Sequence, residues 1–345
     1  MTKSSHIPVL DVLRGVAAVA VCLFHFTNGN PSFLPEADPV RRAGSFGFLG
    51  VEAFFVISGF IIPYSLSLRG YRLRDAPGFL IRRLKRLDPP YFACILLVLA
   101  LHRISAMVPG FRGPPLDLGW PQLLAHVGYL NAILNYDWLS PVFWTLALEF
   151  QFYLFVAIVF PLLVHPRGVV RAGTLLLVAV AGFAGSGNSA LLPHWLPLFA
   201  IGVLTFEAYT GRLNRPVSLL LLAVASIATW VVIGPLHWGA GLATAVAIAV
   251  SGPREMPRSL APLAGAGALS YSLYLLHVPF GMRVINLATR LPSVPVYRYA
   301  AVLLALAVSL GAAYLFWRWI ERPSQLWAQG KPAWPRKSEA HSGKR

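Results

Sequence analysis

Repeated apolar runs are the feature that most limits the fold of this chain. Stretches of about 20 mostly apolar residues, the length that a helix needs to cross a bilayer, recur from residue 8 to residue 320. Backbone polar groups inside a bilayer must find hydrogen bonds within the protein, and a helix satisfies them locally. The sequence therefore predicts an all-α fold, a polytopic transmembrane helix bundle.

The composition supports the same class. Hydrophobic residues make up 57% of the 345 residues and charged residues 12%, whereas soluble domains carry about 25% charged residues. The net charge of +16 comes mainly from short loops between apolar runs, which membrane topology explains better than nucleic-acid binding does. Cys22 and Cys94 lie inside apolar runs without metal-ligand spacing, so we expect buried side chains and no metal site.

Charge placement predicts the topology. Residues 120–136 form an eleventh candidate span, which is short and carries His126, Asn131 and Asn135. If this segment does not cross, most basic loops share one side, which the positive-inside rule makes the cytoplasm. We therefore predict about ten spans, possibly eleven, with both termini cytoplasmic. The ten segments are 8–27, 46–67, 88–108, 142–164, 170–187, 193–210, 216–233, 236–251, 260–282 and 297–320.

The two ends of the chain complete the predicted organisation. Asp11 and Arg14 interrupt the first apolar run, so we interpret it as a retained helix and not as a cleaved signal peptide. Residues 1–325 are predicted to form one transmembrane domain. Residues 326–345 are predicted to form a polar, disordered cytoplasmic tail.

Ionisable residues inside spans are costly, and each is a candidate site residue. In the first span, Asp11 and Arg14 share a helical face, either as an interfacial ion pair or as part of an internal polar network. His25 lies roughly 16 Å further along, toward the outer side; it is either an interfacial ring or a catalytic group. Glu52, in the second span at a similar depth, either faces water or fixes the tautomer of an imidazole.

The stretch "FLIRRLKRLDPPYF" concentrates positive charge. Arg83 and Arg86 are three residues apart and should share one face of a short helix that ends near the prolines at 89 and 90. Paired guanidinium groups suit phosphate or pyrophosphate, and Arg82 and Lys85 add to the charge. The alternative is ordinary cytoplasmic anchoring.

The later spans carry further candidates. Glu149 and Tyr153 are four residues apart on one face, and Glu149 should point into the bundle because it lies deep in an apolar run. His277 lies near the outer end of the ninth span. Glu321, which precedes "RPSQ", is interpreted as the interfacial end of the last span.

Six segments together resemble the membrane-bound acyltransferase-3 family, which are bacterial integral-membrane enzymes that O-acylate sugars. They occur in the family's order between about residues 9 and 325, and the order makes the resemblance specific although each segment alone is weak. They are "LDVLRGVAAVAVCLFHF", "GVEAFFVISGFII", "RRLKRLDPPYF", "FWTLALEFQFYLF", "LSYSLYLLHVPF" and "WIERPSQ".

The resemblance implies roles for individual residues. His25 matches the family's candidate catalytic histidine, and Arg14 matches the arginine of the same helix. Arg83 and Arg86 match a cytoplasmic pair associated with the acyl donor. Glu149 matches the acidic residue of the tryptophan-to-glutamate motif, and His277 matches a late histidine. Thr145 replaces the usual serine but keeps a hydroxyl group. The hydrolase-like extracytoplasmic domain fused to some members is missing, so no two-step relay within one chain is expected.

The expected activity is transfer of an acyl group, chiefly acetyl, from cytoplasmic acyl-CoA to a sugar hydroxyl. The acceptor would be an exopolysaccharide, a lipopolysaccharide, a lipid-linked glycan or a glycosylated metabolite, at a bacterial inner (cell) membrane. His25 would act as general base or as nucleophile, and Glu52 or Glu149 would orient it. The expected catalytic residues are His25, Glu149, Glu52 and His277; the expected donor-binding residues are Arg83, Arg86, Arg14 and Arg82.

The acyltransferase interpretation requires a polar channel from Arg86 to His25. Two other classes of function stay open. A proton-coupled transporter also uses intramembrane histidines and carboxylates, although the sequence shows no clear internal repeat. A lipid-linked glycosyltransferase would carry acidic residues in an early outer loop, for which only Glu36 and Asp38 are present.

Overall fold

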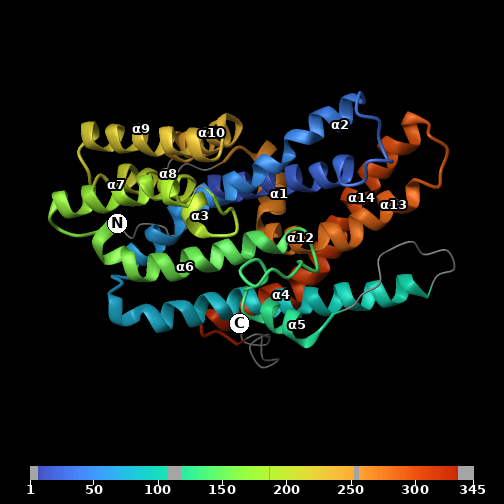
Figure 1. The fold of residues 1–345 in the computed structure, drawn as a ribbon, viewed down its shortest axis with the longest axis horizontal. Coiled ribbons are helices and arrows are strands. Elements are labelled where there is room, and N and C mark those ends of the chain that lie inside the picture. The colour runs from blue at the N-terminus through green and yellow to red at the C-terminus, as the bar shows by residue number, and fades with distance from the viewer. Residues whose placement is uncertain (1–6, 108–117, 186, 252–255, 333–345) are drawn as a thin grey trace, which may run out of the picture.

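The chain folds as a bundle of long helices that run roughly along one direction (Figure 1). The computed structural model describes residues 7–107, 118–185, 187–251 and 256–332, and every regular element in these ranges is helical. The all-α prediction is therefore confirmed. The long helices are α1 (Pro8–Asn28), α3 (Gly50–Leu68), α4 (Ala76–Ala106), α6 (Phe143–Leu163), α7 (Gly168–Ala184), α8 (Leu192–Thr210), α9 (Arg215–Val232), α10 (Pro235–Ser251) and α14 (Pro295–Phe316).

Several of these helices are long and apolar enough to cross a membrane. In the described ranges, six helical stretches meet both conditions, and a pair bent by 57° makes a seventh if it counts as one span. The bent pair is Arg258–Ala268 with Ser270–Ala288, while α7 and α10 are apolar but have only 17 residues each. The chain is thus a multi-pass membrane protein. The count of ten spans and the side of the termini stay predictions.

Short helices connect or interrupt the long ones. They are α2 (Pro39–Gly44), α5 (Trp120–Val127), α11 (Ala261–Ala268), α12 (Ser270–Leu276), α13 (Met282–Ala288) and α15 (Arg322–Ala328). Helix α15 continues into the stretch predicted as a tail. The tail residues 333–345 lie outside the described residues.

Residues 120–136, the eleventh candidate span, form the short helix α5 followed by a turn. Eight residues make a helix about 12 Å long, too short to cross a bilayer. The chain then turns at Tyr129 and Asn135, which both have φ of 58°. The buried His126 ring lies 2.8 Å from the Gln122 carbonyl through Nδ1 and accepts a 3.1 Å bond from the Leu139 N–H through Nε2. The polar side chains of this segment therefore hold a folded connection together.

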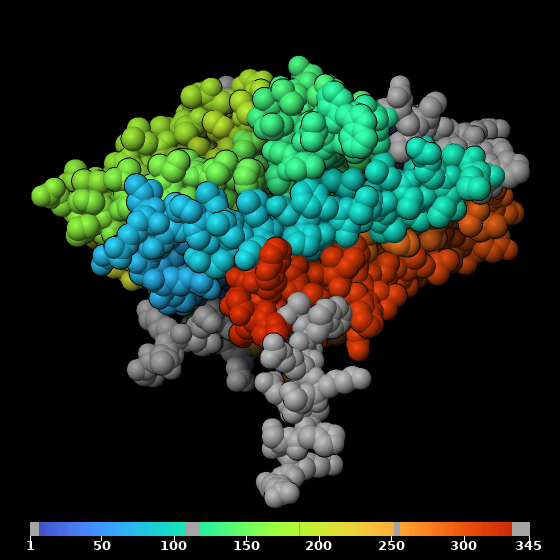
Figure 2. All heavy atoms as spheres, turned by 90° about the horizontal axis from the view of Figure 1, so that it is seen from below, coloured from blue at the N-terminus to red at the C-terminus, as the bar shows by residue number. Residues whose placement is uncertain are grey.

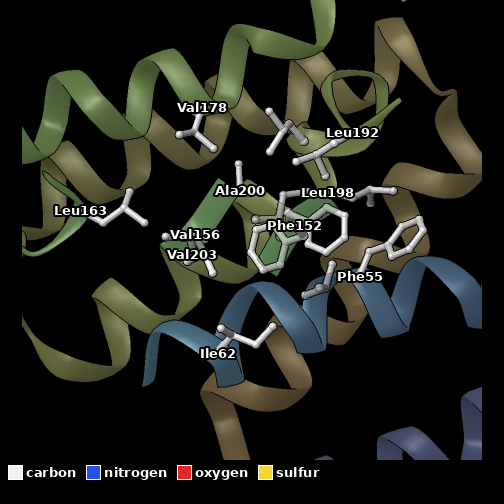
Figure 3. Packing of buried hydrophobic residues seen from close by; sticks show 14 of the residues in the cluster. Phe55, Ile62, Phe152, Val156, Leu163, Val178, Leu192, Leu198, Ala200 and Val203 are labelled. Atoms are coloured by element: carbon white, nitrogen blue, oxygen red, sulfur yellow. The ribbon is translucent and has the colours of Figure 1, made fainter. Parts of the chain in front are cut away.

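A large apolar cluster packs α3, α6, α7 and α8 together (Figure 3). At its centre the rings of Phe152 and Phe199 stack at 4.1 Å, and Phe55 stacks on Phe199 at 4.8 Å. All three side chains are buried. Because lipid tails are as apolar as these side chains, close packing is what favours contact between helices over contact with lipid.

Two glycines let α1 and α11 approach closely. A Cβ atom added to Gly15 would lie 1.9 Å from the Leu263 carbonyl oxygen, and one added to Gly267 would lie 1.8 Å from that of Asp11. Small residues at such crossings allow backbone-to-backbone contact between membrane helices. Any side chain at either position would force the helices apart.

Helix α4 does not end at its prolines, so the predicted short helix is wrong. Pro89 and Pro90 lack the N–H groups that would bond to the carbonyls four residues earlier, those of Lys85 and Arg86. The Ser324 hydroxyl lies 2.5 Å from the first carbonyl oxygen and 3.1 Å from the second. Membrane helices tolerate proline where neighbours bond the freed groups. Figure 2 shows the C-terminal helices, in red, along this part of α4.

Two other interior prolines follow the same rule. Pro161 frees the Ala157 carbonyl, which accepts a 2.6 Å bond from the Tyr71 hydroxyl. Pro279 frees the carbonyl of residue 275, to which the Cys94 thiol donates at 3.4 Å. Cys94 is fully buried, as predicted for it. Side-chain donors thus replace missing N–H groups in three helices.

Glu321 is not an interfacial helix end, so that prediction is also wrong. A π-turn over Trp317–Glu321 joins α14 to α15, and the carboxylate is only 2% exposed. Its Oε2 accepts bonds from the Ser272 N–H at 3.1 Å and hydroxyl at 2.5 Å, and its Oε1 accepts one from Gln325 at 2.7 Å. Glu321 therefore fastens α12 to the last helices, because a buried carboxylate must be hydrogen-bonded.

Candidate active site

A cavity between α1, α3, α4, α6 and α12 gathers four of the eight predicted site residues. Its volume is about 100 Å³. Arg14, Arg83 and Arg86 line it together with Glu149. Arg82, also predicted to bind the donor, is not among the lining residues. We call the part of the bundle around the three arginines the basic end.

Aromatic and acidic partners fix the position of Arg83. Its guanidinium carbon lies 5.4 Å from the centre of the Phe79 ring and 5.2 Å from that of Tyr153. The Tyr153 hydroxyl donates a hydrogen bond to Oε1 of Glu149, the pairing that their four-residue spacing predicts. Because Tyr153 touches both groups, the arginine and the carboxylate are held on the same wall of the cavity.

The charges around the cavity do not balance. Three guanidinium groups face one carboxylate among its lining residues. Like charges in a site shielded from water repel one another more strongly than at a surface. An anion bound there would relieve this repulsion, and guanidinium groups favour phosphate or carboxylate oxygens. The basic end therefore has the chemistry of an anion site.

Hydroxyl groups also line the cavity. Thr145 and Tyr274 pair through their oxygens at 2.7 Å, and the Tyr271 hydroxyl donates to the Leu87 carbonyl at 2.9 Å. All three side chains line the cavity. The sequence did not predict this role for Tyr271 and Tyr274, although the unusual polarity of "LSYSLYLL" for a span was the available signal.

The structure brings the two predicted histidines together. The ring centres of His25, near the end of α1, and His277 lie 5.0 Å apart. His277 is fully buried at the start of a π-turn, His277–Gly281. Its Nδ1 lies 3.1 Å from the Leu273 carbonyl oxygen and so must donate. In the neutral ring Nε2 is then the unprotonated nitrogen, and within the described residues it has no hydrogen-bond partner. We call this pair the histidine end.

Tyr274 lies between the two ends. It lines the cavity, and its ring centre is 5.8 Å from that of His277. His25 is not among the cavity-lining residues. The expected polar channel from Arg86 is therefore present as far as Tyr274, and the rings of Tyr274 and His277 occupy the remaining stretch to His25.

Glu52 has a different partner from the one considered for it. Its Oε1 lies 2.6 Å from Nδ1 of His237, at the start of α10. Its Oε2 is buried and without a hydrogen-bond partner in the described part of the chain. The sequence analysis missed His237, because 185 residues separate it from Glu52 and no local pattern connects them. Glu52 thus orients His237 and not His25. Glu149, the other carboxylate expected to orient His25, bonds to Tyr153.

A comparison with known protein families identifies the chain's family. The family model described as "Acyltransferase domain" matches residues 7–318. The chain belongs to the acyltransferase-3 family. The match includes both the basic end and the histidine end.

Two relatives of this family member are informative. O-acetyltransferase OatA of Staphylococcus aureus is 28% identical over 94% of this chain. BcsY of Komagataeibacter xylinus, which is provisionally named a membrane-bound transacylase, is 29% identical over 80% of this chain and 73% of its own length. The match covers 58% of OatA, so the chain spans little more than half the length of that relative. No solved structure matches the chain.

Proposed function

We propose that this protein transfers an acetyl group from cytoplasmic acetyl-CoA to a hydroxyl group of a sugar in a glycan or glycosylated metabolite, at the bacterial inner membrane. The observation that carries the proposal is the cavity in which three arginines face Glu149, set in the same bundle as the paired imidazoles. OatA, by its name an O-acetyltransferase, is a relative over nearly the whole chain. Membrane lipids surround the bundle.

The basic end suits the donor. Acyl-CoA carries a pyrophosphate and a further phosphate group, and Arg83 and Arg86 offer forked guanidinium groups near the cytoplasmic side of the predicted topology.

The histidine end suits proton transfer. In the proposed step, the His25 imidazole accepts the proton of the acceptor hydroxyl, whose oxygen attacks the thioester carbonyl carbon. The new C–O bond forms as the C–S bond breaks, and the imidazolium returns its proton to the sulfur to release CoA with a free thiol. Prior transfer of the acetyl group to His25 gives the same products in two steps. His277, 5.0 Å away, lies close enough to steady the charged ring.

The proposal is tested with membrane vesicles of both orientations. Inside-out vesicles should consume added acetyl-CoA only when glycans from the source envelope are enclosed in their lumen, and mass spectrometry should find acetyl groups on those glycans. Right-side-out vesicles should not consume it, because the donor site faces the cytoplasm. Acetyl-CoA consumption without glycan acetylation, or equal consumption by both vesicle types, would argue against the proposal.

A further inference from the structure

A second, larger cavity opens beside the histidine end. Its volume is about 520 Å³, and it lies between the end of α4, the segment before α6, and the π-turn with α13. It is separate from the cavity of the basic end, with which it shares no lining residue. Its polar lining comprises His102, Ser105, Ser140, Arg283, Asn286 and Arg290.

The lining of this cavity is positively charged. Arg283 and Arg290 both line it, and no aspartate or glutamate does. Arg283 is half-buried and donates to the carbonyl of Pro279 in the π-turn, which holds its guanidinium group against the cavity wall. In the predicted topology these are two of the few arginines on the outer side, where basic residues are disfavoured. Membrane topology therefore does not explain them.

A buried hydroxyl group faces the same space. Ser140 is only 2% exposed, lines the cavity, and its Oγ has no hydrogen-bond partner within the described residues. A buried polar group without a hydrogen-bond partner is destabilising. Such a group beside a cavity of this size points to a polar ligand that completes its hydrogen bonding.

The cavity adjoins the proposed chemistry. Val278 and Pro279, which directly follow His277, form part of its wall. Asn286, on its α13 side, accepts a 2.8 Å bond from Asn30, in the loop that follows α1 and His25. A ligand in this cavity would therefore lie next to the histidine end.

We infer that this cavity binds the acceptor, and that the acceptor is an anionic glycan whose carboxylate or phosphate is held by Arg283 and Arg290. The inference rests on the proposed function, since it names the substrate class for the same reaction. The anionic group anchors the sugar, and the neighbouring hydroxyl is presented to His25. Charge-assisted bonds to two guanidinium groups give the selectivity for anions.

The test measures binding to the full-length protein in phosphatidylcholine nanodiscs. The probes are a fluorescent oligogalacturonate and the same oligosaccharide with its carboxylates converted to amides. We expect the charged probe to bind about tenfold more tightly or better, and Arg283→Gln with Arg290→Gln to abolish that preference. Arg42→Gln, which changes an exposed arginine in α2 outside this cavity, should keep it.

The other outcomes are equally decisive. Equal binding of both probes, or a full preference in the double variant, would overturn the inference. Loss of oligogalacturonate binding when phosphatidylglycerol is added to the nanodiscs would assign the arginines to lipid headgroups instead. Acetyl-CoA affinity is measured on the same samples, so that failure of the acceptor site is distinguished from failure of the proposed function.

Discussion

At the scale of single residues, the basic end is a cluster of charge that only partly cancels. Arg14, Arg83 and Arg86 reach it from two helices, and Glu149 is the one carboxylate that lines the cavity with them. Glu149 also accepts the Tyr153 hydroxyl proton in a hydrogen bond. Positive charge therefore exceeds negative charge among the groups that line the cavity.

Glu149→Gln tests this balance. The neutral amide keeps the shape but removes the one negative charge that lines the cavity with the guanidinium groups, so the free protein should melt at a lower temperature. Acetyl-CoA should then raise the melting temperature by more than it does in the unchanged protein, because its phosphates supply the missing charge. Thermal unfolding with and without acetyl-CoA provides the measurement. An unchanged melting temperature together with an unchanged acetyl-CoA shift would contradict the balance.

Residue spacing predicted part of this site. Arg83 with Arg86, and Glu149 with Tyr153, were found because residues three or four apart share a helical face. The pairing of Glu52 with His237 and the buried role of Glu321 could not be found in this way. The first contact joins residues that are 185 positions apart, and the second joins residues that are 49 positions apart. Only the packed bundle brings these residues together.

At the scale of helices, the prolines explain the largest error of the sequence analysis. A local rule ends α4 at Pro89 and Pro90, because each removes one backbone hydrogen bond. The helix continues because Ser324 bonds to the two carbonyls that they free. The serine belongs to "WIERPSQ", more than 230 residues further along the chain. A local sequence pattern therefore cannot connect the two prolines with the serine that compensates for them.

A double-mutant cycle tests this compensation. Ser324→Ala should destabilise the protein by about 1–3 kcal/mol, since the two carbonyls lose their donor. The same change should cost less when Pro89 and Pro90 are both alanine, because their restored N–H groups bond to those carbonyls directly. Ser324→Thr keeps the hydroxyl and is the control. Reversible unfolding in mixed micelles gives the stabilities, and an equal cost in both backgrounds would show that Ser324 does not act through the prolines.

At the scale of the whole molecule, the bundle separates two kinds of chemistry. Anion-binding groups lie at the basic end, and the paired imidazoles lie at the histidine end, with Tyr274 between them. The apolar runs predicted a helical membrane bundle because their length and hydropathy are local properties. Beyond Tyr274 the cavity ends, because aromatic and imidazole rings fill the space up to His25. This depends on how rings from different helices pack, which the sequence does not reveal. We propose that the donor's acyl end passes Tyr274 to reach His25.

The central claim is that the basic end binds the donor and the histidine end catalyses the transfer. Separate measurement of donor binding and turnover tests this claim most directly. For Arg86→Gln we predict an acetyl-CoA dissociation constant raised about tenfold, with the turnover rate at saturating donor nearly unchanged. For His25→Gln we predict turnover lowered by about 10²–10⁴-fold, with the dissociation constant unchanged. Arg74→Gln, an exposed arginine outside the cavity, should alter neither. If His25→Gln weakened donor binding instead, or left turnover intact, the two ends would not have the roles assigned to them.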